Sequence, residues 1–395
     1  MSLDVLALRT EDEGPGYPRA AALLGGLAAA GVAVREVRVA MPGRGRDKQR
    51  IARSPWRWPG FGAALLRARG RARAALRAAI AARRPDLVLV LHPGHFLAGL
   101  ARREFAGPVV LDLFLSIHDT VVGDRQSYRA GGIVARGLRW LDRRACAAAE
   151  LVLLDTAAHA ERVAALTALP ARRFSWLPVA DVLAAPAAMP YRPPRPGERL
   201  ELLFFGTGVP LHGLPYLLQA VARARGVRLT LVGGTAEERE QAATLPPGSL
   251  DLQPAFVGPA ELAGLLARAH LVAGVFGTSD KADRVVPFKV MHALAAGRPV
   301  LTGDSRAVRE LLAPGHDCLV VPRGDAAAIA RALEAAAEDP GRLAAMAGLA
   351  RASYERHFTL AATGARLSGL LHAVAGRPPA AVDVDRDVCA GVAAR

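Results

Sequence analysis

Short apolar runs alternate with amphipathic segments along most of this chain. In the first half the strand-like runs are 4–8, 32–39, 87–91, 109–113 and 151–154. Helix-like segments lie between them, at 19–30, 67–83 and 133–149. Because parallel strands that are buried on both faces read as continuous apolar runs, this alternation predicts βαβ units. The expected fold class is therefore α/β, with a doubly wound sheet.

The pattern stops at 184–199, which contains five prolines, and then restarts. Strands are expected at 200–205, 228–232, 252–256, 271–275 and 299–302. Helices are expected at 214–225, 236–244, 259–270 and 287–296, and from residues 307 and 325 onward. Since proline is excluded from helix interiors and central strands, 184–199 is interpreted as a hinge. The predicted organisation is a domain at 1–183, a second at 200–357, a helix at 358–375 with a return to the first domain as one option, and a flexible tail at 376–395.

Composition narrows the class of protein. The chain has 395 residues, 52% hydrophobic and 22% charged, which excludes general disorder and allows two or three domains. No apolar stretch reaches the roughly 18 residues that a membrane-spanning helix needs, and no secretory signal is recognised. Cys146, Cys318 and Cys389 lie far apart, without metal-ligand spacing. We therefore expect a cytoplasmic protein, with a peripheral position on the inner face of the membrane as an option.

Positive charge is concentrated in one segment. The chain carries 51 Lys+Arg against 36 Asp+Glu, and thirteen of the basic residues lie at 44–84 with the single acid Asp47. Trp56, Trp58, Phe61, Leu65 and Leu66 are interspersed among them. This mixture is typical of a segment that binds an anionic membrane surface, although a solvated basic helix has a similar composition. Nucleic-acid binding is not expected, because no recognition motif accompanies the charge.

Two segments of the second half predict a phosphate site. Gly206, Thr207 and Gly208 form a glycine turn between a strand and a helix, where backbone N–H groups can meet a phosphate. Pro287 and Phe288 begin a second helix whose first turn contains Lys289. A cation there is disfavoured by the helix dipole unless an anion binds it. The alternative is an exposed lysine on a helix surface.

The same segments resemble a known family. Gly-x-x-x-Pro-x-x-Gly at 206–213 and Pro-x-Lys-x-x-x-Ala-Leu-Ala-x-Gly-x-Pro-Val at 287–300 resemble the retaining GT-B glycosyltransferases of the group 1, or family four, class. Leu-Val-Gly-Gly at 231–234, Phe-Val-Gly at 256–258 and the segment 314–322 agree with it. The resemblance covers about 200–357, and 108–119 of the first half is more loosely similar. It implies two Rossmann-like domains around a cleft, and transfer of a sugar from a nucleoside-diphosphate sugar to a glycan, glycolipid or other small acceptor.

The resemblance also implies which residues hold the donor. Thr207 and His212 stand where the family has an arginine and a lysine for the diphosphate, and Arg284 and His292 stand where it has two glutamates. Lys289 and Arg284 are expected to restore the missing cations, and His292 to bond a ribose hydroxyl. The donor-binding residues are Gly206, Thr207, Gly208, His212, Gly233, Phe256, Val257, Arg284, Val286, Pro287, Phe288 and His292. The four departures support an alternative, a GT-B-like protein that binds sugar nucleotides without turnover.

A polar segment of the first half follows a predicted strand. His118 and Asp119 lie in it, and the resemblance implies that the histidine contacts the transferred sugar, with Asp119 orienting the ring. The alternative is a hydrogen-bonded core histidine. With Lys289 these are the expected catalytic residues. Acceptor-side candidates that would converge on the same sheet edge are Gly14, Gly16, Arg19, His95, Asp124 and Arg125.

No metal site or cofactor is predicted. Asp-x-Asp does not follow a strand in either half, and 383–387 lies in the expected tail. Cationic side chains and helix dipoles are then expected to stabilise a leaving diphosphate. The sequence does not identify the nucleobase or the sugar, whose family contacts are largely to backbone near 254–258.

Overall fold

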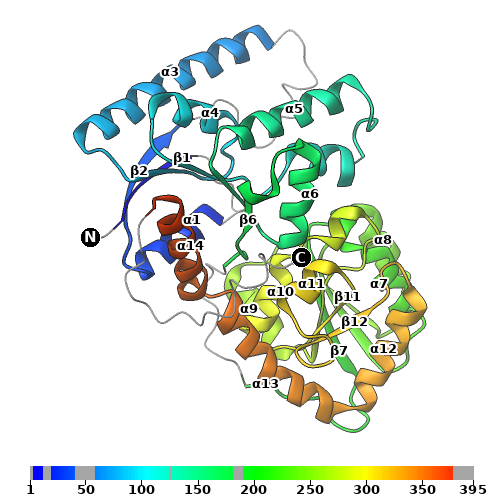
Figure 1. Ribbon diagram of the computed structural model, residues 1–395. Helices are drawn as coiled ribbons and strands as arrows, with labels where there is room; N and C mark the ends of the chain where they lie inside the picture. Colours follow the sequence, from blue (N-terminus) through cyan, green and yellow to red (C-terminus); the bar gives the residue numbers. More distant parts are fainter. Residues whose placement is uncertain (1–2, 12–18, 41–57, 125, 181–189, 377–395) are drawn as a thin grey trace. The chain divides into compact units, whose positions relative to one another are not determined.

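The structure, a computed structural model, describes residues 3–11, 19–40, 58–124, 126–180 and 190–376 (Figure 1). It contains two six-stranded sheets with helices packed against them. The chain divides into two compact units. The described residues within 1–113, 145–152 and 360–395 form unit 1, and those within 114–144 and 153–359 form unit 2.

The first sheet has the strand order β2-β1-β3-β4-β5-β6. Its strands are β1 (Asp4–Thr10), β2 (Ala33–Val39), β3 (Leu87–Val90), β4 (Val109–Asp112), β5 (Leu151–Leu154) and β6 (Phe174–Trp176). The helices of this part are α1 (Arg19–Ala29), α3 (Trp58–Ala82), α4 (His95–Glu104), α5 (Ile133–Ala147) and α6 (Ala157–Thr167), with the short helices η2 (Asp119–Asp124) and η3 (Ala171–Arg173). β3 and β4 are entirely buried, which explains why they read as apolar runs in the sequence.

The second sheet has the order β12-β11-β10-β7-β8-β9, and all its neighbouring strands are parallel. Its strands are β7 (Leu200–Gly206), β8 (Val227–Gly233), β9 (Leu250–Leu252), β10 (Leu271–Ala273), β11 (Val300–Gly303) and β12 (Cys318–Val321). Its helices are α7 (Leu214–Val221), α8 (Ala236–Ala243), α9 (Pro259–Arg268), α10 (Phe288–Ala295), α11 (Arg306–Leu311), α12 (Ala326–Glu338) and α13 (Pro340–His357), with the short helices η4 (Pro210–His212) and η5 (Asp280–Asp283). The expected strand at 252–256 is shorter and begins earlier. The Gln253 N–H still donates to the Leu231 carbonyl oxygen, and Pro254 has no N–H with which to continue the pairing.

Unit 2 begins well before the expected hinge. Phe114 and Val179 belong to the same buried apolar cluster as Val286, Val290 and Met291 of the second half. Because these residues share one core, the described residues within 114–144 and 153–183 belong to unit 2. The predicted domain boundary at 184 had placed them in the first domain. The described part of the expected hinge, 190–199, has no helix or strand. Its Tyr191 donates a hydrogen bond from Oη to the His270 carbonyl oxygen at 2.9 Å.

Unit 1 contains a close crossing of two helices. α14 (Leu360–Val374) packs against α1, and a Cβ placed on Gly364 would lie 2.0 Å from the carbonyl oxygen of Gly26. Only glycine fits where two helix backbones approach so closely. The last helix therefore lies in the same unit as the first.

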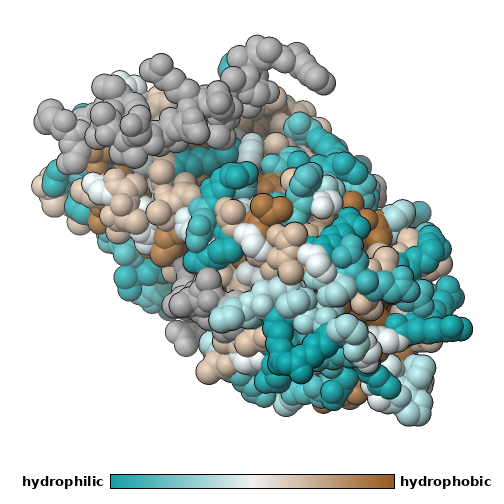
Figure 2. All heavy atoms as spheres, turned by 90° about the horizontal axis from the view of Figure 1, so that it is seen from below, coloured by the Kyte–Doolittle hydropathy of each residue, from teal (hydrophilic) through white to brown (hydrophobic). Residues whose placement is uncertain are grey.

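The basic segment is partly described. Residues 41–57, with Trp56, lie outside the described residues. α3 carries the rest of the segment except Arg83 and Arg84, which follow its last residue. Arg73 and Arg77 of α3 both form ion pairs with Glu104 of α4. Within the described ranges no helix is long and apolar enough to cross a bilayer. On the face in Figure 2, hydrophilic residues are spread between small apolar patches.

Candidate functional site

The turn after β7 brings two basic side chains of unit 2 together. His212 lies in η4, and Lys289 is the second residue of α10. A Cβ on Gly206 would lie 2.7 Å from His212 Cε1 and 3.1 Å from Lys289 Nζ. Both side chains thus lie directly against the Gly206 backbone, where any larger residue would displace them.

Lys289 is buried, with 3% of its surface exposed. Its Nζ lies 3.7 Å from the centroid of the Phe204 ring and has no hydrogen-bond partner among the described residues. Burial lowers the pKa of the Lys289 ammonium well below its ordinary value, and the charge of Glu238 opposes that effect. The alternative of an exposed helix-surface lysine is therefore wrong.

His212 is buried in the same place. Its Nδ1 has no hydrogen-bond partner in the described part of the chain. Burial, and secondly the charge of Lys289, lower the pKa of His212 to about 2. The imidazole is consequently neutral in this structure, and its protonation would require the negative charge of a bound anion.

Together these groups make a candidate anion site. A lysine and a histidine with unsatisfied nitrogens, next to the N-terminus of α10, offer donors and positive potential but no acceptor carboxylate in contact. Buried polar groups are nearly always paired in native proteins, so two adjacent unpaired ones indicate a missing partner. A phosphate or diphosphate would offer both nitrogens negative charge and acceptor oxygens.

Glycines hold the surrounding turns close together. Gly233 has a φ of 88°, and a Cβ there would lie 2.0 Å from the Gly206 carbonyl oxygen. That oxygen accepts a hydrogen bond from the Gly234 N–H at 2.8 Å. Gly208 also has a positive φ and lies against Thr235, while the Thr207 side chain is exposed.

The other expected donor residues differ in their contacts and burial. His292 stacks on Phe205, with ring centroids 6.1 Å apart, and contacts Phe288 on its own helix. Pro287 caps the N-terminus of α10, and Val286 and Val257 are buried in the core. Phe256 is 83% exposed in the loop before α9. The stack on Phe205 places His292 beside the strand that ends at Gly206.

The segment around His118 is held by a residue that the sequence analysis did not select. Asp142 of α5 accepts hydrogen bonds from Ser116 Oγ at 2.7 Å, from the Ile117 N–H at 3.1 Å and from the His118 N–H at 3.0 Å. Burial, opposed by the charges of Asp142 and Asp119, lowers the pKa of the His118 imidazole. Its Nδ1 has no hydrogen-bond partner among the described residues.

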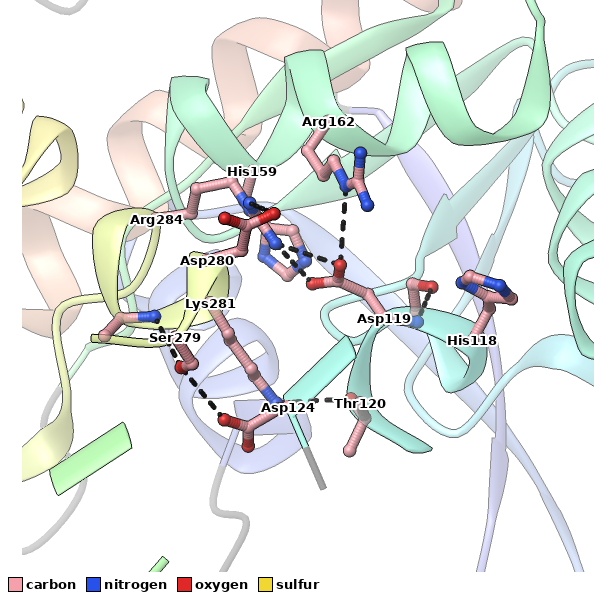
Figure 3. A network of polar contacts seen from close by, with 12 residues as sticks. His118, Asp119, Thr120, Asp124, His159, Arg162, Ser279, Asp280, Lys281 and Arg284 are labelled. Carbon is pink, nitrogen blue, oxygen red and sulfur yellow. Dashed lines mark hydrogen bonds and ion pairs between the residues drawn. The ribbon is translucent and has the colours of Figure 1, made fainter. Parts of the chain in front are cut away.

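Asp119 does not orient the His118 ring, so that part of the prediction is wrong. Both of its carboxylate oxygens accept hydrogen bonds from Nη2 of Arg284 at 2.9 Å, and Arg162 Nε lies 3.5 Å away (Figure 3). Burial alone would raise the pKa of Asp119, but Arg284 and its neighbours lower it below the usual range. The Arg284 guanidinium is therefore already paired with a carboxylate. This corrects the expectation that Arg284 restores a cation for the diphosphate.

Residues 279–284 connect this network to the glycine turn. Ser279 Oγ donates to Asp124, and Lys281 Nζ donates to Thr120, each at 3.2 Å (Figure 3). On its other side, Ala282 packs with Leu211, the neighbour of His212. Residues 279–284 thus contact both the chain after His118 and the neighbour of His212.

The beginning of α6 completes the network. His159 Nδ1 lies 2.6 Å from Asp155 Oδ1, and both side chains are buried. Glu310 of α11 accepts hydrogen bonds from the Ala157 and Ala158 N–H groups at 2.8 Å. The Thr156 hydroxyl donates to the Arg284 carbonyl oxygen at 2.6 Å. The contacts of Glu310 and of the Thr156 hydroxyl join segments far apart in sequence, so no local pattern predicts them.

The acceptor-side candidates are only partly described. Gly14, Gly16 and Arg125 lie outside the described residues. Arg19 Nε donates to Asp112 at 2.8 Å, with both side chains buried in unit 1, and His95 is buried at the start of α4. Of the three described candidates, only Asp124 belongs to the network of Figure 3. Among the described residues, no three His, Cys, Asp or Glu side chains are grouped as metal ligands would be.

Comparison with known proteins gives the fold. Residues 199–339 match the model of a family described as glycosyl transferases group 1. HepE of Anabaena, solved in complex with UDP, is similar with a TM-score of 0.65 at 16% identity, over 94% of this chain and 100% of that chain. Sucrose-phosphate synthase from Thermosynechococcus elongatus gives 0.69 at 16% identity, over 94% and 99%. The lipopolysaccharide outer core galactosyltransferase WaaB gives 0.63 at 11% identity, over 94% and 97%. Curated proteins give no significant sequence match. At these identities the similarity establishes the fold, which is GT-B.

Proposed function

We propose that this protein is a retaining glycosyltransferase that takes a sugar from a nucleoside-diphosphate donor. The GT-B fold and the family match over residues 199–339 support this class of enzyme. One observation carries the proposal: Lys289 and His212 have unsatisfied nitrogens at Gly206, where the glycine turn meets the start of α10. HepE has been solved with UDP and with UDP-glucose, which makes a uridine nucleotide the first donor to test.

In the proposed mechanism the cations act on the leaving group. As the bond from the anomeric carbon to the diphosphate breaks, negative charge grows on the diphosphate oxygens. Lys289 donates hydrogen bonds to these oxygens, His212 adds a donor, and the dipole of α10 favours the same charge. Groups fixed in place before the reaction stabilise this charge without reorganisation. We propose that they do so without a metal ion, so that treatment with a chelator leaves turnover unchanged.

His118 is proposed to contact the transferred sugar. Its backbone is fixed by Asp142, while Nδ1 is left without a partner in the described structure. A neutral imidazole can donate or accept a hydrogen bond at a sugar hydroxyl. In the resembling family the acceptor oxygen attacks on the face from which the diphosphate leaves, and the diphosphate takes the acceptor's proton. That sequence of events gives retention without a protein nucleophile.

The test is release of nucleotide from a panel of UDP-, GDP- and dTDP-sugars, with saccharide and lipid-linked acceptors present. A retaining enzyme releases nucleoside diphosphate with one of them and keeps the anomeric configuration in the product. His118→Ala should lower kcat more than it raises the donor KM, because the contact is to the reacting sugar.

The second candidate function is a GT-B-like protein that binds a sugar nucleotide without transferring the sugar. Arg284 favours it, since the position that the family fills with a glutamate is here occupied by an arginine paired with Asp119. Tight donor binding with no nucleotide release from any donor would select this candidate. Inverted product configuration would instead reject the retaining mechanism.

A further inference from the structure

The outward side of α5 carries a row of arginines and apolar side chains. Ile133, Arg136, Trp140 and Arg144 are spaced three or four residues apart, so they lie on one face of the helix. We call these four residues the α5 stripe. The buried face of the same helix contains Ala135 and Asp142.

The apolar members of the stripe are strongly exposed. Ile133 is 80% exposed and Trp140 is 58% exposed, although both residue types normally bury most of their surface. Val134 and Tyr128, close by in the chain, are also exposed. Several large apolar side chains gathered at one place on a surface are characteristic of an interaction site.

The charge around these side chains is positive. Arg136, Arg139, Arg143 and Arg144 all lie on exposed positions of α5. Arg144 lies over the Trp140 ring at 5.2 Å, and Arg143 donates to the Thr167 and Ala168 carbonyl oxygens. The helix contains one acid, Asp142, which is buried and bonded to Ser116 and the chain after it. Among the described residues, none of these four arginines forms an ion pair.

We propose that the α5 stripe docks on an anionic lipid bilayer. Tryptophan and isoleucine enter the boundary between headgroups and acyl chains, while neighbouring arginines bind lipid phosphates. The composition of the stripe matches that of interfacial helices, which combine an apolar anchor with Arg and Lys at the headgroup level.

The inner side of α5 relates this docking to the site. Asp142, on that side, holds Ser116, Ile117 and His118, so a single helix separates the His118 turn from the proposed bilayer. A helix with its side chains is about 10 Å thick. Docking therefore favours a lipid-linked acceptor at His118. This consequence for the acceptor rests on the proposed function. The docking of the α5 stripe on a bilayer does not depend on it.

The experiment is flotation of the full chain with phosphatidylcholine vesicles, with and without phosphatidylglycerol. Binding should need the anionic lipid and weaken as salt rises. The double variants Ile133→Ser/Trp140→Ser and Arg136→Gln/Arg144→Gln should each release the protein, with about a fivefold loss for each arginine removed. Arg67→Gln/Arg71→Gln, at exposed positions of α3, is the matched control and should bind as the wild type does.

Several results would overturn the proposal. Wild-type protein that ignores anionic vesicles at low salt would do so, as would equal binding to neutral vesicles. Release by the α3 control but not by the α5 variants would assign the membrane surface to α3. A dimer in solution that Trp140→Ser dissociates would assign the stripe to a second copy of the chain. Thermal unfolding of each variant verifies its fold, and donor binding, measured separately, tests the proposed function.

Discussion

The buried amine of Lys289 is expected to lower the free energy of unfolding by an amount that can be measured. A buried amine with no hydrogen-bond partner loses its hydration without compensation, and burial lowers its pKa. Lys289→Met keeps the length of the side chain and removes the polar group. We expect it to increase the free energy of unfolding by about 1–3 kcal/mol, measured by denaturant titration at neutral pH.

The control is the other buried lysine of unit 2. Lys281 donates to Thr120, so Lys281→Met should decrease stability rather than increase it. The gain from Lys289→Met should also shrink as the pH rises toward the ordinary lysine pKa, because the unfolded chain then loses its proton as well. A loss of stability in Lys289→Met would contradict the account of an unsatisfied amine.

The same lysine predicts how donor binding depends on pH. Burial lowers the pKa of Lys289, and an adjacent diphosphate raises it again by its negative charge. A group whose pKa is higher in the complex takes up a proton on binding, so affinity falls as the pH rises through that range. Calorimetric titration in PIPES and in Tris, which differ in ionisation enthalpy, measures this uptake. Identical apparent enthalpies in the two buffers would contradict it.

Among the elements, the crossing of α1 and α14 depends on two glycines. Gly364→Ala would place a Cβ 2.0 Å from the Gly26 carbonyl oxygen, and backbone on both sides must move. We expect a loss of about 2–4 kcal/mol, in the range of overpacked or strained core positions. A Cβ on Gly369 of the same helix would meet no atom within 4 Å, so Gly369→Ala should be neutral or stabilise by up to about 1 kcal/mol. Equal effects in the two variants would show that the helices do not cross here.

A second prediction concerns the turn at 116–118, which is hydrogen-bonded to Asp142 of α5. Asp142→Ala would leave the Ser116 hydroxyl and the Ile117 and His118 N–H groups without their acceptor. Because His118 is proposed to contact the sugar, kcat should fall about tenfold or more while the donor KM changes little. Asp142→Asn keeps one acceptor oxygen and should recover part of the loss. A changed KM with normal kcat would make Asp142 part of donor binding instead.

At the scale of the whole molecule, the sequence predicted the α/β class and most strands of both sheets. Apolar runs such as 87–91 and 271–275 contain the buried strands β3 and β10, and the glycine and proline motifs at 206–213 and 287–300 identified the GT-B fold. These features succeed because periodicity and turn chemistry are local. Lys289 and His212 were found for the same reason, through motifs next to strand ends.

The polar network was harder to predict because its contacts are long-range. Arg284 pairs with Asp119 across 165 positions of sequence, and nothing near either residue indicates the other. Asp142 had a local signal that was missed, since it is an acid on the buried face of a helix that also buries Ala135 and Cys146. An isolated charge among core positions needs partners, which the fold supplies at Ser116 and His118.

The central claim is that Lys289 holds the diphosphate of a nucleotide donor. The most direct measurement is calorimetric titration of the wild type and of Lys289→Met with UDP, GDP and dTDP. At least one of them should bind the wild type, and the variant should bind it about 10–100-fold more weakly, the size expected for a hydrogen bond to a charged group. Equal affinity in the two proteins, or no binding of any nucleoside diphosphate to the wild type, would contradict the claim.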